Sequence, residues 1–140
     1  MTEHGKARKN RKRDLEAHHG HVHNYDSKAI AGGVFVVNMA STFMSPLRGG
    51  AITVHGSKNR TIQMIVDGSI SELRGVSERQ NVNGTGLDAK CAIVVDVNNI
   101  NFASASFVQQ KPAPLVGDPL NYDSFIQRVC AFYEQRFASN

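Results

Sequence analysis

Two short apolar runs constrain the fold of this chain more than any other feature. VFVVNMA spans residues 34–40, and CAIVVDV spans residues 91–97. Both runs are rich in β-branched residues, which favour strands. A pair of glycines precedes the first run and a pair of asparagines follows the second, and both pairs interrupt regular structure. We therefore predict two strands, and we expect the more apolar one, residues 91–97, to lie at the centre of a sheet.

Further strands are predicted from alternation of apolar and polar residues. Residues 51–55 (AITVH) and 61–67 (TIQMIVD) both alternate, so they predict a hairpin joined by the polar turn GSKNR. Residues 100–108 would pair with the central strand across the two asparagines, which suit a tight turn. After residue 67, a second interpretation makes Ser69 the N-cap of a short helix with Glu72 in a capping box. We prefer a further strand there.

Three segments are predicted as connections. Residues 43–50 contain a proline and a glycine pair, and residues 109–119 contain three prolines. Residues 75–90 form a polar stretch that we expect to be an exposed loop. A connection of this length in a small domain often makes functional contacts.

The clearest predicted helix lies at the C-terminal end. Apolar residues recur there at intervals of three and four, which places them on one stripe that would pack on the sheet. Asp118 or Asn121 would cap the start of the helix. The stripe consists of Tyr122, Phe125, Ile126, Val129, Cys130, Tyr133 and Phe137.

These elements predict an α+β fold. It has an antiparallel β-sheet of four to six strands, an amphipathic C-terminal helix packed on that sheet, and an extended basic N-terminal arm. With 140 residues the chain has the size of one domain. We divide it into a basic, His-rich arm (residues 1–27) and a single α+β domain (residues 28–140). The arm holds too few apolar residues to order itself, although a helix over about residues 8–17 fits its composition.

The positive charge of the chain is concentrated in its first 28 residues. They carry seven basic and four acidic side chains, whereas the remainder carries nine basic and eight acidic ones. This asymmetry predicts a polyanionic partner or an acidic subunit surface for the arm, and a solvated tail is the alternative. The basic run has no aromatic residue for base stacking, so we expect phosphate contacts with little sequence preference. The candidate residues for nucleic-acid or subunit contact are Lys6, Arg8, Lys9, Arg11, Lys12 and Arg13.

Four histidines follow the basic run. On an extended chain His19, His21 and His23 would point to one side and could bind Zn²⁺, Ni²⁺ or Cu²⁺. Structural zinc sites usually have four ligands, often including thiolates, and neither cysteine is near in sequence. A flexible polar stretch is the alternative, and near pH 6 its imidazoles would add positive charge to the arm. The candidate metal ligands are His18, His19, His21 and His23.

No catalytic or cofactor motif emerges from the sequence. His55, Asp67 and Asp96 could perform acid–base chemistry if they converged, but their spacing does not bring them together. Residues 84–89 have a G-x-G-x-x-A spacing without the strand before it and the helix after it that a dinucleotide site requires. We therefore expect no cofactor.

Cysteine usage and hydropathy limit the compartment. Cys91 and Cys130 both lie in apolar surroundings, and we expect buried free thiols, with a disulfide between them as the alternative. No run of about 18 apolar residues is present, so we expect no membrane partner. The basic N-terminus is not followed by an apolar segment, which argues against a secretory signal. We expect a virion or cytoplasmic location.

A basic arm on a near-neutral body, without a catalytic motif, suggests a non-enzymatic structural subunit. We expect it to assemble with identical or related subunits in a nucleic-acid-containing particle, such as a virus or phage capsid, connector or tail. The first alternative is a free nucleic-acid-binding or ribosome-associated protein. The second is a small oligomeric α+β enzyme.

Overall fold

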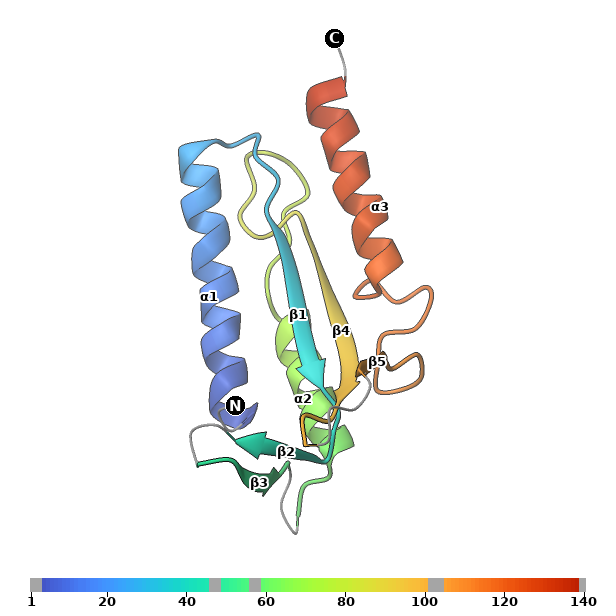
Figure 1. Cartoon of the computed structure of the whole chain (residues 1–140). Helices are drawn as coiled ribbons and strands as arrows, with labels where there is room; N and C mark the ends of the chain where they lie inside the picture. The colour runs from blue at the N-terminus through green and yellow to red at the C-terminus, as the bar shows by residue number, and fades with distance from the viewer. Residues whose placement is uncertain (1–3, 46–48, 56–58, 101–104, 139–140) are drawn as a thin grey trace.

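The computed structural model describes residues 4–45, 49–55, 59–100 and 105–138 (Figure 1). Within these ranges the chain forms three helices and five strands, and the last helix continues into a π-helical turn. The elements are α1 (His4–Tyr25), β1 (Gly32–Asn38), β2 (Thr42–Ser45), β3 (Ala51–Val54), α2 (Ile62–Arg74), β4 (Ala89–Val97), β5 (Ala105–Phe107), α3 (Tyr122–Tyr133) and η2 (Glu134–Ala138).

A mixed sheet with the strand order β1-β4-β5 forms the centre of the fold. β4 runs parallel to β1, with Val34 opposite Cys91, and antiparallel to β5, with Val95 opposite Phe107. The central position of β4 is confirmed, but the predicted single antiparallel sheet of four to six strands is wrong. The chain from β1 to β4 includes a helix, and such a crossover allows the second strand to run in the direction of the first. β2 and β3 form a separate antiparallel pair, and β2 lies in a segment predicted as a connection.

The helix α2 occupies residues predicted as the second strand of a hairpin. Val66, Ile70 and Leu73 are buried at helical spacing, whereas Met64, which completed the strand-like alternation, is exposed. Thr61 caps the helix, because its hydroxyl accepts a hydrogen bond from the Met64 N–H at 3.3 Å. The apolar residues of this short segment fit both the strand period of two and the helix period of 3.6. Only the helix places Val66, Ile70 and Leu73 together on one buried face.

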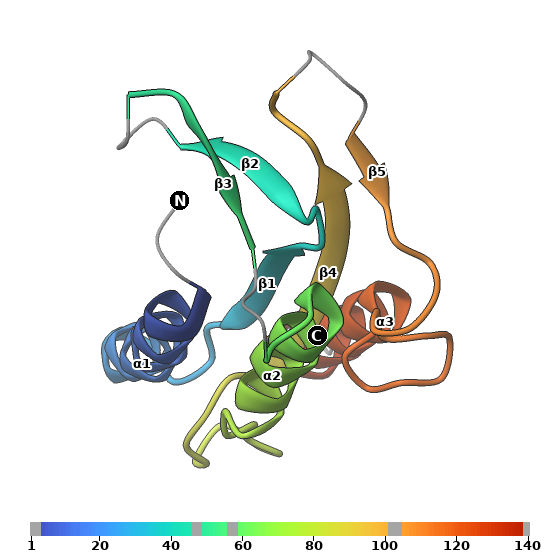
Figure 2. The same cartoon turned by 90° about the horizontal axis from the view of Figure 1, so that it is seen from below.

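Helices cover both faces of the mixed sheet. On one face, Phe35 and Val94 belong to the main core with Leu73 of α2. On the other face, Phe125 of α3 packs with Cys91 in a smaller cluster. Figure 1 shows α1 and α3 on opposite sides of the β1–β4 pair, and Figure 2 shows the β2–β3 pair and β5 away from the three helices.

The N-terminal segment is a helix and not an extended arm. Leu15 and Val22 of α1 pack against the main core, and Leu15 lies beside Gly33 of β1. Arg8 passes close over Gly68 of α2, where an added Cβ would meet its guanidinium group. The helix expected over residues 8–17 is therefore present. Its few apolar residues could not stabilise it alone, and packing of Leu15 and Val22 against the body does so instead.

The C-terminal helix begins where it was predicted, with Asn121 as N-cap accepting a hydrogen bond from the Asp123 N–H at 3.0 Å. Its predicted apolar stripe is only partly packed on the sheet. Phe125 is the one buried residue of α3, and Val129 packs partly beside it. The rest of the stripe is exposed to solvent.

Candidate functional site

Two of the predicted basic contact residues face α2. Arg8 Nε lies 3.8 Å from Glu72 Oε1. Lys12 Nζ lies 3.8 Å from Glu16 Oε1 on the same helix and also approaches Gly75 at the end of α2. Both side chains are partly buried, so they serve contact between the two helices more than contact with a partner.

The remaining surface of α1 is exposed and basic. Lys9, Arg11 and Arg13 are exposed and take part in no hydrogen bond or ion pair among the described residues. Lys9 and Arg13 lie one turn apart, and Arg11 lies on another side of the helix; we call these three residues the basic surface of α1. One exposed acidic residue, Asp14, accompanies them. The side chain of Lys6 lies outside the described part of the structure.

The candidate metal ligands do not gather in one place. Successive residues of a helix are rotated by about 100°, so alternate histidines cannot share one side as they would on an extended chain. His19 and His23 have ring centroids 6.1 Å apart, and His18 and His21 are exposed. Across the described ranges, no group of three or more His, Cys, Asp or Glu residues is placed to hold a metal ion.

A buried carboxylate connects four segments of the chain. Asp88, just before β4, accepts hydrogen bonds from Arg79 Nε at 2.9 Å and from Arg79 Nη2 at 3.2 Å. It also accepts from the Ala31 N–H at 2.8 Å and from Arg136 Nη2, and His23 Nε2 lies 3.2 Å from Oδ2. We call these five residues the Asp88 cluster. It joins α1, the start of β1, the 75–88 loop and η2.

The electrostatics of the Asp88 cluster favour an ionised carboxylate. Burial raises the pKa of Asp88, but hydrogen bonds from Arg136 and Arg79 outweigh burial and hold the pKa at about 2. Burial lowers the pKa of His23, and the Arg79 charge lowers it further, against the opposing charge of Asp88. Because two guanidinium groups already face one carboxylate, the fold favours a neutral His23 ring.

This arrangement predicts that acid weakens the fold in two steps. Because the pKa of His23 is lowered on folding, the unfolded chain binds its proton more readily, and stability decreases as the pH falls through about 6.5. The lowered pKa of Asp88 removes roughly 2 kcal/mol more as the pH falls from about 4 to about 2. Urea unfolding at pH values from 8 to 2 measures both steps. His23→Gln should flatten the first step, and an unchanged profile in that variant would contradict the assignment.

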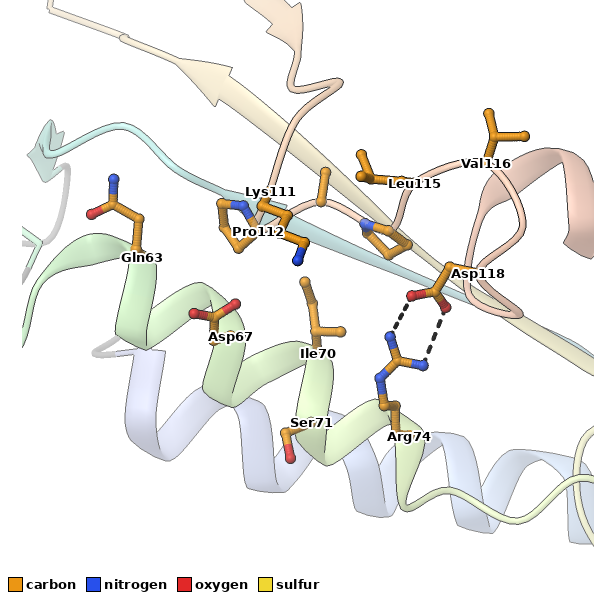
Figure 3. A pocket seen from close by; sticks show the side chains of 12 residues that line it. Gln63, Asp67, Ile70, Ser71, Arg74, Lys111, Pro112, Leu115, Val116 and Asp118 are labelled. Carbon is orange, nitrogen blue, oxygen red and sulfur yellow. Dashed lines mark hydrogen bonds and ion pairs between the residues drawn. The ribbon is translucent and has the colours of Figure 1, made fainter.

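A groove of about 580 Å³ lies between α2 and the segment that precedes α3 (Figure 3). Arg74 and Asp118 meet at one end, with Nη1–Oδ1 and Nη2–Oδ2 distances of 3.1 and 2.5 Å. This pairing lowers the pKa of Asp118. The other charged lining residues are Asp67 and Lys111, so the charges of the groove balance. Its lining residues include no histidine or cysteine that could serve as a base or nucleophile.

The three residues considered for acid–base catalysis lie on different elements. Only Asp67 lines the groove. His55 is buried after β3, with its ring centroid 4.1 Å from that of Phe43, and Asp96 is exposed near the end of β4. The groove therefore does not bring His55, Asp67 and Asp96 together, as acid–base catalysis by these three residues would require.

The two cysteines differ in their surroundings. Both are free thiols; Cys91 is buried as predicted, but Cys130 is exposed because only part of the α3 stripe reaches the sheet. Burial raises the pKa of Cys91 to about 11, so this thiol is poorly reactive. Among the helices that the structure describes, none combines the length and apolar character needed to cross a membrane.

Comparison of the chain with protein-family models, curated proteins and solved structures finds no match. The sequence pointed to the basic residues of α1 as candidates for contact but gave no indication of the Asp88 cluster. Arg79 and Asp88 lie in a segment expected to be an exposed loop, and both are buried. No spacing in the sequence connects them to His23 or Arg136.

Proposed function

We propose that this protein is a non-enzymatic structural subunit of a nucleic-acid-containing particle, such as a virus or phage capsid, connector or tail. One observation carries the proposal. The basic surface of α1 (Lys9, Arg11, Arg13) faces solvent without partners among the described residues, on a helix that the body holds in place. Basic side chains on a fixed element can neutralise phosphates without ordering a flexible tail first.

Features of the body weigh against the enzyme alternative but are shared with the free nucleic-acid-binding alternative. Beyond residue 28 the chain carries nine basic and eight acidic residues, so α1 supplies most of the attraction for a polyanion. The groove beside α2 lacks a set of residues suited to acid–base catalysis, which weighs against the enzyme alternative. A free nucleic-acid-binding protein would use the same basic surface, but it would not need to associate with identical subunits.

The proposal predicts that the basic surface of α1 governs the binding of duplex DNA. Changing Lys9, Arg11 and Arg13 together to Gln should weaken binding at least about tenfold at low salt. It should also reduce the slope of log K against log salt by about 2, because Lys9 and Arg13 share one side of the helix, whereas Arg11 lies on another. Fluorescence anisotropy of a labelled duplex over a salt series measures both quantities. Gln preserves the helix, whereas deletion of α1 would also remove Leu15 and Val22 from the core.

A matched control separates this surface from net charge. Lys28, Arg60 and Lys111 are exposed and lie outside α1, and changing all three to Gln removes the same charge. The control variant should retain a salt slope close to that of the unmodified protein. Equal losses in the two triple variants would contradict a role for α1, and absence of binding by the unmodified protein at low salt would contradict nucleic-acid contact.

A further inference from the structure

α3 carries an apolar flank beside the residues that pack on the sheet. Phe125 and Val129 face β4. Rotation by about 100° per residue places a second set next to them on one side of the helix. Tyr133 and Phe137 belong to this set, and their ring centroids lie 5.4 Å apart. The set consists of Tyr122, Ile126, Cys130, Tyr133 and Phe137, all exposed.

Hydrogen bonds made by Arg128 and by the backbone of β4 show which side of the sheet the apolar flank of α3 faces. Arg128 lies on the opposite flank and donates through Nη2 to the Lys90 carbonyl at 2.9 Å. The backbone groups of Lys90 and Ala92 point to the same edge of β4, and the Ala92 N–H donates to the Leu120 carbonyl at 3.0 Å. That edge is therefore the one away from β1. The apolar flank of α3 consequently faces the β1 side of the sheet.

The outer face of β1 continues this apolar flank. Val34 and Val36 point to the same face of the sheet as Cys91, on which α3 lies, and both are exposed. The six larger side chains of the combined surface are between 38 and 58 % exposed. We call the surface the α3–β1 corner: Val34, Val36, Tyr122, Ile126, Cys130, Tyr133 and Phe137.

The size and chemistry of the α3–β1 corner match those of a subunit interface. None of its seven side chains is charged, so the surface has no group that could neutralise a phosphate. Half-exposed aromatic and aliphatic side chains of this number present on the order of 500 Å² of apolar surface. A standard interface buries about 800 Å² on each partner, of which roughly 60 % is apolar. One such corner on each of two copies is therefore enough for a stable dimer.

We propose that two copies of this chain associate through the α3–β1 corner, with their α3 helices side by side and antiparallel. In each corner the C-terminal helix forms one side and the outer face of β1 forms the other. A second α3 placed against the first covers Val34 and Val36 of its partner while it buries its own apolar flank. A two-fold axis makes the two contacts equivalent, so each subunit uses the same side chains to bind the other. Cys130 lies near the middle of the flank, between Tyr122 and Phe137, and therefore lies near the axis.

The solution mass tests this interface. The 140-residue protein should sediment at tens of micromolar as twice its 15.3 kDa chain mass. Ile126→Glu should weaken self-association at least about tenfold, because it places a charge on the contact between the helices. Met64→Glu, on an exposed face of α2, is the matched control and should leave the dimer intact. A monomeric unmodified protein, or a dimer that Ile126→Glu does not weaken, would overturn the interface.

Cross-linking tests the antiparallel arrangement directly. A short bis-maleimide should link two chains through Cys130, whereas the buried Cys91 should not react. Cys130→Ser should abolish the link. A dimer that forms no link through Cys130 would overturn the antiparallel arrangement.

The biological meaning of the dimer rests on the assembly role proposed above, but its test does not. A dimer that binds no DNA would overturn nucleic-acid contact and leave the interface standing. A monomer that binds DNA through α1 would do the reverse and favour the free nucleic-acid-binding alternative.

Discussion

Replacement of Asp88 by Asn is expected to lower the free energy of unfolding by about 3–5 kcal/mol. The carboxylate is 1 % exposed and is the common acceptor for Arg79 and Arg136. Without its charge, two guanidinium groups remain in a buried site with no anion. A domain of this size has a total stability of roughly 5–15 kcal/mol, so the loss is a large part of the whole. Urea unfolding at pH 7 measures it.

An exposed aspartate provides the comparison for Asp88. Asp96 lies near the end of β4, but its side chain is in solvent. Asp96→Asn should change the free energy of unfolding by no more than about 0.5 kcal/mol. If Asp88→Asn also stayed within about 1 kcal/mol of the unmodified protein, the Asp88 cluster would not hold the four segments together.

Gly86→Ala is expected to cost about 3 kcal/mol or more of stability. Gly86 has a φ of 122°, and an added Cβ would lie 2.6 Å from the Ser77 carbonyl oxygen, which is main chain and cannot move aside cheaply. The neighbouring chain segments are paired there: the Arg79 N–H donates to the Leu87 carbonyl, and the Leu87 N–H donates to the Ser77 carbonyl, both at 2.9 Å. This pairing positions Arg79 and Asp88, so the variant should also disturb the Asp88 cluster.

The same substitution at Gly20 should have the opposite sign. Gly20 lies within α1, and an added Cβ would meet nothing within 4 Å. Ala is favoured over Gly inside a helix by about 0.5–1 kcal/mol, so Gly20→Ala should raise the melting temperature. Thermal unfolding followed by circular dichroism compares the two variants. A Gly86→Ala protein as stable as Gly20→Ala would contradict the close approach of the backbone at residue 86.

The glycine spacing at residues 84–89 thus has a structural explanation. The sequence argued against a dinucleotide site there because no strand precedes the spacing and no helix follows it. In the structure, Gly86 allows two chain segments to pair, and Ala89 begins β4. The glycine-containing segment, whose spacing resembled that of a dinucleotide site, instead allows the pairing that places Arg79 next to Asp88.

The local pattern of apolar residues predicted an element correctly where only the strand pattern or only the helix period fitted the segment. The β-branched runs predicted β1 and β4, and the spacing of three and four predicted α3 with Asp118 or Asn121 as its cap, of which Asn121 is the one observed. It failed at residues 61–67, where a few apolar residues fit two periods and α2 formed instead of a strand. Local pattern also could not supply strand direction, which depends on how the chain crosses between β1 and β4.

The sequence by itself determined the main strands, the C-terminal helix and the concentration of positive charge near the N-terminus. Only the tertiary structure decided which of those charges reach solvent, because packing against α2 turns Arg8 and Lys12 inward and leaves Lys9, Arg11 and Arg13 outside. It also brought His23, Arg79 and Arg136 to one buried carboxylate. The physical reason is that burial depends on contacts between residues far apart in the chain, whereas periodicity and composition report only on neighbours.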